Sequence, residues 1–105
     1  MRIAFKMSVY PEFVQEYEKR HNPIWDELKQ VLLDHGVLSY SIFLDEKTHT
    51  LFAYAEIESI EQWDKIADTQ VCQRWWDYMA PLMPVHEDNS PQSTPLRQVF
   101  FMEAD

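Results

Sequence analysis

Residues 17–25, Tyr-Glu-Lys-Arg-His-Asn-Pro-Ile-Trp, decide how the first half of this chain folds. A helical pattern runs into this stretch, and Tyr17 and His21 lie four residues apart within it, so they share one helix face. Pro23 interrupts the helix, because proline lacks the backbone N–H and its ring crowds the carbonyl four residues back. We therefore expect Asn22 to cap a second helix with Pro23 in its first position, which leaves His21 at a helix end facing a cleft.

Outward from this break, the spacing of apolar residues predicts the other elements. Strict alternation is typical of half-buried strands, and apolar residues three and four apart are typical of helices. The predicted order is a strand over residues 2–9, helices over 12–22 and 23–34, strands over 37–44 and 50–57, helices over 60–67 and 70–80, a polar loop over 85–95 and a strand over 96–102.

Local signals support the ends of these elements. Gly36 suits the left-handed position after a helix, Ser59 with Gln62 forms a predicted capping box, and Thr69 begins the last helix. The resulting βαββαβ order is that of the α+β ferredoxin-like fold, an antiparallel sheet with helices on one face. We expect one domain over residues 1–105.

The predicted strand over residues 37–44 carries apolar side chains on both faces. One face is predicted to hold Leu38, Tyr40, Ile42 and Leu44, and the other Val37, Ser39, Ser41 and Phe43. Helices on one side of the sheet would leave an apolar patch on the other side. A second copy of the chain could cover that patch, so we expect a homodimer with sheet packed on sheet.

Composition narrows the class of function. The formal net charge is -9 and no basic patch is present, which argues against nucleic acid or anionic membrane surfaces as partners and favours a neutral small molecule. The single cysteine, Cys72, cannot form an internal disulfide. No stretch has the length of a membrane span or the pattern of a signal peptide, so we expect a soluble cytoplasmic protein.

The candidate site residues are histidine and aromatic side chains. His21 can give and take a proton near neutral pH, although a histidine at a helix end can also be a plain surface residue. Neighbouring residues of a helix point about 100° apart, so Trp75 and Trp76 could divide between core and pocket, although the sequence alone favours both as core and interface residues. Tyr17 and Tyr40 could each be core residues or pocket walls with a hydroxyl to offer.

Several kinds of chemistry lack their sequence patterns. No spacing typical of a zinc site occurs, the one glycine excludes a glycine-rich phosphate loop, and no serine lies in a nucleophile elbow. We therefore expect no cofactor and no metal, which leaves acid–base chemistry or simple binding.

Three stretches together resemble the L-rhamnose mutarotase family, and the likeness extends over nearly the whole chain. They are EYEKRHNPIW at residues 16–25, VCQRWW at residues 71–76 and DNSP at residues 88–91. The resemblance implies a dimeric α+β barrel and an isomerase that interconverts the α and β anomers of L-rhamnose.

The resemblance also implies roles for particular residues. His21, in the RHNP motif, would be the proton donor, and Tyr17, Tyr40, Trp75 and Trp76 would bind the sugar. Two rival functions are a cofactor-free monooxygenase on the same barrel and a non-catalytic binding module, because one fold can serve many functions.

Overall fold

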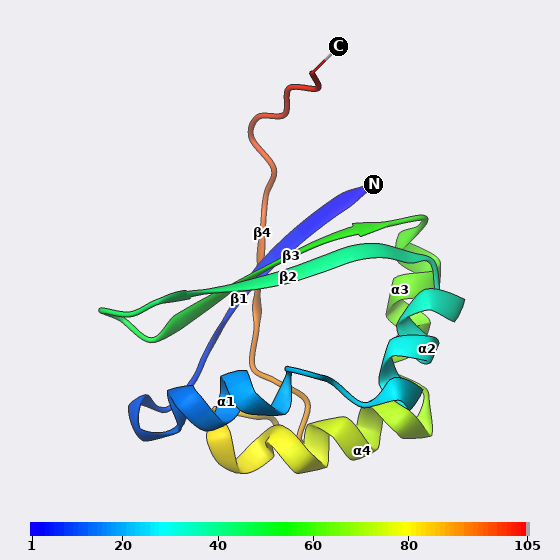
Figure 1. Cartoon of the computed structure of the whole chain (residues 1–105). Coiled ribbons are helices and arrows are strands. Elements are labelled where there is room, and N and C mark those ends of the chain that lie inside the picture. Colours follow the sequence, from blue (N-terminus) through cyan, green and yellow to red (C-terminus); the bar gives the residue numbers. More distant parts are fainter. Residues whose placement is uncertain (105) are drawn as a thin grey trace.

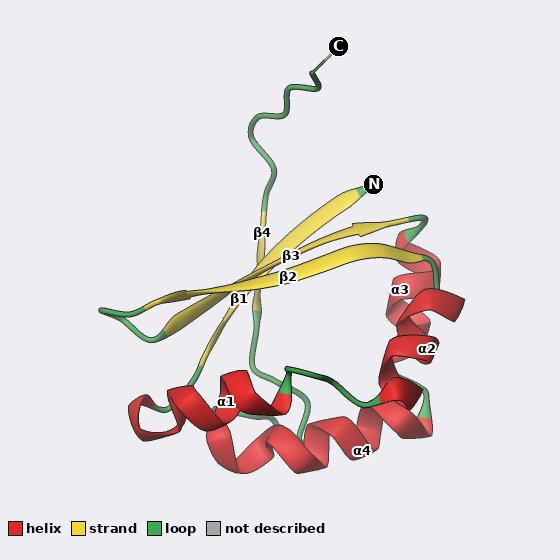
Figure 2. Cartoon of the chain, in the orientation of Figure 1, coloured by secondary structure: helices red, strands yellow, loops and turns green. Residues whose placement is uncertain are grey.

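Four antiparallel strands form one sheet, and the helices lie on one side of it (Figure 1). The computed structural model describes residues 1–104. The strands are β1 (Arg2–Ser8), β2 (Val37–Asp45), β3 (Thr50–Ile57) and β4 (Thr94–Leu96), in the sheet order β2-β3-β1-β4. The α-helices are α1 (Val14–Arg20), α2 (Asp26–Asp34), α3 (Ile60–Ile66) and α4 (Gln70–Met79), with 3-10 turns η1 (Pro11–Phe13) and η2 (Ala80–Leu82) (Figure 2). The predicted ferredoxin-like fold is confirmed.

The core lies between the sheet and the helices. Alternate residues of β3 face it and are almost wholly buried, namely Leu51, Ala53, Ala55 and Ile57. This alternation follows from the pleat, which sends successive side chains to opposite faces. Fully burying a side chain such as Ile57 stabilises the fold by about 1.5–3 kcal/mol. No helix within residues 1–104 is both long enough and apolar enough to span a membrane.

A bulge at the start of β2 makes one predicted strand face wrong. Val37 pairs with Ile57, but the next paired residue, Ser39, is opposite Glu56, so Leu38 is the extra residue. A bulge reverses which residues face the core on its two sides. Val37 is therefore buried and lies on the helix side of the sheet, as Tyr40 does further along, whereas Leu38 is 63% exposed.

The break after α1 differs from the predicted one. Helix α2 begins at Asp26, not at Pro23, and the Asn22–Pro23 peptide is cis. Asn22 does not cap α2, because its side-chain amide donates to the carbonyl of Glu18 at 2.8 Å and so completes the end of α1. The residue before α2 is Trp25, which makes no side-chain cap.

The other predicted helix ends are close to the observed ones. The Ser59 hydroxyl accepts a hydrogen bond from the Gln62 N–H, and the Thr69 hydroxyl accepts one from the Cys72 N–H, both at 3.2 Å. The Gln62 side chain reaches back to the Ser59 hydroxyl (3.1 Å) and not to its backbone N–H. Gly36 has φ +79°, the left-handed conformation expected after α2.

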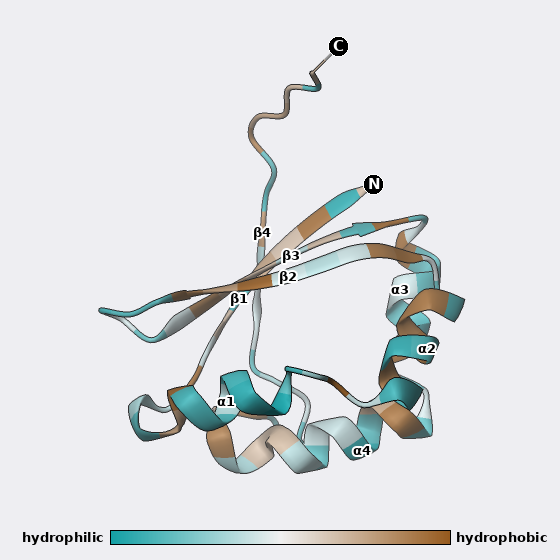
Figure 3. Cartoon of the chain, in the orientation of Figure 1, coloured by the Kyte–Doolittle hydropathy of each residue, from teal (hydrophilic) through white to brown (hydrophobic). Residues whose placement is uncertain are grey.

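The last strand is shorter than predicted and begins earlier. β4 pairs with β1, with Leu96 opposite Ala4, and it ends there instead of running to Met102. The register explains the end, because β1 itself begins at Arg2 and has only two residues left to pair. Residues 97–104 project past the sheet (Figures 1 and 3), with their most apolar side chains, those of Val99, Phe100, Phe101 and Met102, 44–80% exposed.

Candidate functional site

A cavity of about 1340 Å³ lies between the sheet and the helices. This volume is larger than that of ordinary small-molecule pockets, which is about 300–1,000 Å³. All five residues singled out from the sequence line this one cavity, and they come from α1 and the residue that follows it, from β2 and from α4. They are Tyr17, His21, Tyr40, Trp75 and Trp76.

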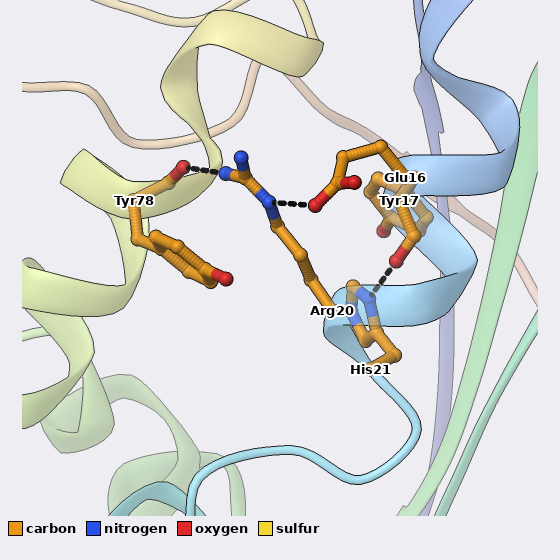
Figure 4. Close-up of polar contacts among 5 residues, drawn as sticks. All are labelled: Glu16, Tyr17, Arg20, His21 and Tyr78. Carbon is orange, nitrogen blue, oxygen red and sulfur yellow. Dashed lines mark hydrogen bonds and ion pairs between the residues drawn. The ribbon is translucent and has the colours of Figure 1, made fainter.

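His21 immediately follows α1 and has a fixed orientation. Its Nδ1 lies 2.9 Å from the backbone carbonyl oxygen of Tyr17, one turn earlier (Figure 4). A carbonyl can only accept, so Nδ1 donates and Nε2 is left for other partners. The imidazole stacks on the Tyr17 ring at 4.5 Å and meets the Trp75 ring edge-on at 5.2 Å.

Burial changes the proton affinity of His21. Desolvation lowers its pKa from 6.5, and the hydrogen bond to the Tyr17 carbonyl opposes that shift. The folded protein therefore holds a mainly neutral imidazole at neutral pH, with a proton on Nδ1 and a lone pair on Nε2. Such a group can take a proton at Nε2 and return it there.

The Tyr17 hydroxyl is open to the cavity. Among residues 1–104, each side-chain nitrogen or oxygen that is fully shielded from solvent has a hydrogen-bond partner. Tyr17 is only 8% exposed, and within the same residues no hydrogen bond involves its hydroxyl. The hydroxyl must therefore reach open space, and the space it borders is the cavity. Burial raises the pKa of Tyr17 well above its usual value, so the phenol stays protonated and can donate.

Tyr40 faces the cavity from β2. Its ring meets Phe5 of β1 at 6.4 Å and Trp63 of α3 at 5.6 Å. The side chain as a whole is 36% exposed, but burial around the hydroxyl raises the pKa of Tyr40, and the nearby Tyr17 and Cys72 add to this rise. Both tyrosines therefore offer O–H donors and not phenolate bases.

The paired tryptophans of α4 have different surroundings. Trp75 is 9% exposed and meets His21, Trp25 and Tyr78 with ring centroids 5.1–5.7 Å apart. Trp76 is half-buried and packs against both hydrophobic clusters of the core. Both rings also line the cavity, so each contacts the core and borders the cavity.

Comparisons with known proteins identify the family of the chain. The sequence profile of the L-rhamnose mutarotase family matches residues 2–102. The chain belongs to this family. It is 52% identical over 103 residues to the L-rhamnose mutarotase of Pectobacterium carotovorum subsp. carotovorum, covering 98% of this chain and 99% of that one.

Solved structures of other proteins share this fold. An L-rhamnose mutarotase from Formosa agariphila superimposes with a TM-score of 0.91 at 47% identity and covers 98% of this chain and 99% of its own. An antibiotic biosynthesis monooxygenase also superimposes, with a TM-score of 0.62, 14% identity and coverage of 93% and 97%. At that identity the likeness shows the fold alone, whereas the L-rhamnose mutarotases match this chain in sequence as well.

In this member of the rhamnose mutarotase family, further residues line the cavity that spacing alone did not single out. Trp63 comes from α3, and Asn89 and Ser90 come from the loop between η2 and β4. Asn89 has φ 67°, and its side-chain amide donates to Asp77 of α4 at 3.1 Å, which ties the loop to that helix. The DNSP motif at residues 88–91 contributes to the family resemblance, but the sequence analysis assigned no site role to its residues.

The described residues also bear on whether the chain could bind a metal ion. Within residues 1–104, no three or more His, Cys, Asp or Glu side chains are grouped so that they could hold a metal ion. The polar groups that line the cavity are the imidazoles of His21 and His86, one lysine, hydroxyls, amides and a few carboxylates, set among flat aromatic rings.

Proposed function

We propose that this protein is an L-rhamnose mutarotase in which His21 carries the proton transfer. The observation that carries the proposal is the fixed imidazole, whose Nδ1 is held by the Tyr17 carbonyl while its other nitrogen is free, in a cavity with aromatic walls. Membership of the family supplies the substrate class. An electrically neutral sugar also suits a chain with net charge -9.

Mutarotation opens the pyranose ring at the anomeric carbon and recloses it on the other face. Opening requires a proton for the ring oxygen and the loss of one from the anomeric hydroxyl. In the proposal, protonated His21 delivers the proton from Nε2 to the ring oxygen and recovers it when the ring closes. A positioned acid–base group typically contributes about 10²–10⁴-fold to rate.

The second proton partner is a water molecule in this proposal. Tyr17 and Tyr40 could accept the anomeric proton only as phenolates, and their raised pKa values oppose that form. They serve instead as hydrogen-bond donors to sugar hydroxyls. Before the ring recloses, the aldehyde of the open-chain sugar must rotate about the C1–C2 bond. The flat rings of Trp75 and Trp76 would permit this rotation while they keep the rest of the sugar in place.

A homodimer is part of the proposal, and the outer face of the sheet supports it. Phe43 and Phe52 form a cross-strand pair there, 65% and 40% exposed, with Tyr54 and Leu96 nearby on the same face. Residues 97–102, of which the last four are apolar, form no strand pairing within the described residues and extend from that region. A second copy would cover both.

The dimer has a direct test. Phe52→Lys places a charge on the outer face at a residue that does not line the cavity, so light scattering should show a shift from dimer to monomer. Leu33→Lys, at an apolar residue of α2 that is 54% exposed, is the matched control and should leave the mass unchanged. A wild-type monomer at micromolar concentration would contradict the dimer.

Cytoplasmic location is also part of the proposal. The free thiol of Cys72 is consistent with a reducing compartment.

Saturation-transfer NMR of L-rhamnose tests the activity. The protein should speed exchange between the two anomeric resonances over the spontaneous rate. A folded protein that leaves this exchange unchanged would reject the proposal. An oxygen electrode with a quinol-like substrate then tests the monooxygenase alternative, which predicts oxygen uptake, whereas a pure binding module predicts neither effect.

A further inference from the structure

Arg20, the last residue of α1, makes three contacts at once. Its Nε donates to the Glu16 carboxylate at 2.7 Å, and its Nη1 donates to the backbone carbonyl of Tyr78 in the last turn of α4 (Figure 4). The guanidinium carbon also lies 4.1 Å from the centre of the Tyr78 ring. The Arg20 side chain is only 20% exposed, so this is a semi-buried junction between two helices.

The two contacts with Tyr78 belong to a closed circuit of contacts that includes His21. Tyr78 packs against Trp75 at 5.7 Å, and Trp75 meets His21 at 5.2 Å. His21 follows Arg20 in the sequence, so the contacts run from Arg20 through α4 and return to its neighbour. Because α1 has only seven residues, its end would otherwise be free to fray, and His21 lies just past that end.

Arginine suits this place for a chemical reason. Its planar fork can bond a carboxylate and a carbonyl in different directions while its face lies on an aromatic ring. A lysine has one compact charge and cannot serve all three. The Tyr78 carbonyl belongs to the C-terminal end of a helix, where a cation is favoured. The hydrogen bond from Arg20 also lowers the pKa of Glu16, which keeps that partner ionised.

A second arginine offers a natural comparison. Arg74 of α4 pairs with Glu27 of α2 at 2.9 Å, so it also joins two helices. Its side chain is 57% exposed and its partner's 65%, and pairs of this kind contribute little to stability. Its described contacts include no residue of the circuit around His21.

We propose that Arg20 is a positioning residue, which locks the end of α1 onto the last turn of α4 and so holds the His21 imidazole in its one productive orientation. Arg20 is not among the residues that line the cavity, so it acts through His21 and not on the sugar. The inference deepens the proposed function and rests on it for the importance of His21, but not for the geometry itself.

The experiment compares Arg20→Gln and Arg20→Lys with Arg74→Gln. Both Arg20 variants should lose about tenfold or more in kcat with KM within about twofold, since misplacing a catalytic group costs rate more than binding. Arg74→Gln should match wild type. Tyr78→Phe is a second control, because it keeps both the carbonyl and the ring face that Arg20 contacts.

NMR of the His21 ring nitrogens supplies a readout that general destabilisation would not move. Wild type should show the proton on Nδ1, and the Arg20 variants should show a mixture with Nε2–H. Equal kcat and unchanged ring signals in Arg20→Lys would overturn the proposal, as would equal losses in Arg20→Gln and Arg74→Gln. If Arg20→Gln does not fold, Arg20→Lys and Glu16→Gln carry the test. Absence of mutarotase activity in wild type would overturn the proposed function, while the ring signals would still report the positioning.

Discussion

Replacing Gly36 by alanine should destabilise the fold by about 1.5–3.5 kcal/mol. The backbone there has φ +79°, a conformation that costs an L residue about 1–2 kcal/mol. The new Cβ would lie 2.8 Å from the Gln62 side-chain oxygen and 3.0 Å from the Glu58 Cβ. Moving the Gln62 amide away breaks its hydrogen bond from the Ser59 hydroxyl, a loss of about 0.5–1.5 kcal/mol.

Urea unfolding followed by tryptophan fluorescence measures this change, at one fixed protein concentration because a dimer's stability depends on it. The midpoint should fall with an unchanged m-value, and Tm should drop by roughly 10–20 °C. Two variants separate the causes. Gly36→Asn should lose less than Gly36→Ala, since asparagine tolerates positive φ. In a Gln62→Ala background, Gly36→Ala should also lose less, because one close contact is gone. A loss under about 0.5 kcal/mol for Gly36→Ala would refute the reasoning.

Three further predictions concern single groups in the cavity. Tyr17→Phe keeps the ring but removes the hydroxyl, so KM for L-rhamnose should rise about 3–10-fold with little change in Tm; an unchanged KM would mean that the hydroxyl does not touch the sugar. Burial raises the pKa of Cys72 to about 11 from 9.0, so iodoacetamide should alkylate it about 100-fold more slowly than an exposed thiol at the same pH, and a rate equal to that of glutathione would contradict this. Burial lowers the pKa of His21, so the stability that the neutral ring contributes is present above pH 6.5 and is lost as the pH falls through the pKa of the folded state. Between about pH 7.5 and about pH 5, urea midpoints of wild type should therefore fall more steeply than those of His21→Asn. Parallel curves would show that the ring is not buried in its neutral form.

Much of the fold could be predicted because its signals are local. The caps at Ser59 and Thr69 and the left-handed turn at Gly36 each depend on residues within a few positions of one another. The wrong Asn22 cap is a local error, but two other errors involve distant partners. The exposure of Leu38 depends on pairing with β3, and the end of β4 depends on where β1 begins.

The site divides in the same way. The spacing of Tyr17 and His21 predicts that they share a helix face, and the two rings do stack. Trp63 and Asn89 reach the cavity only because the sheet, α3 and a late loop meet there, and no spacing within the sequence encodes that meeting. The Arg20–Tyr78 junction joins residues 58 positions apart, so it too required the tertiary structure.

The measurement that tests the central claim most directly is saturation-transfer NMR of L-rhamnose with wild type, His21→Asn and His35→Asn. Asparagine can keep the hydrogen bond to the carbonyl one turn earlier while removing Nε2. His35 makes the same kind of bond, with Nδ1 2.7 Å from the Val31 carbonyl, but it does not line the cavity. We predict that wild type and His35→Asn accelerate anomer exchange and that folded His21→Asn loses about 10²–10⁴-fold. Wild-type exchange in folded His21→Asn would contradict the account.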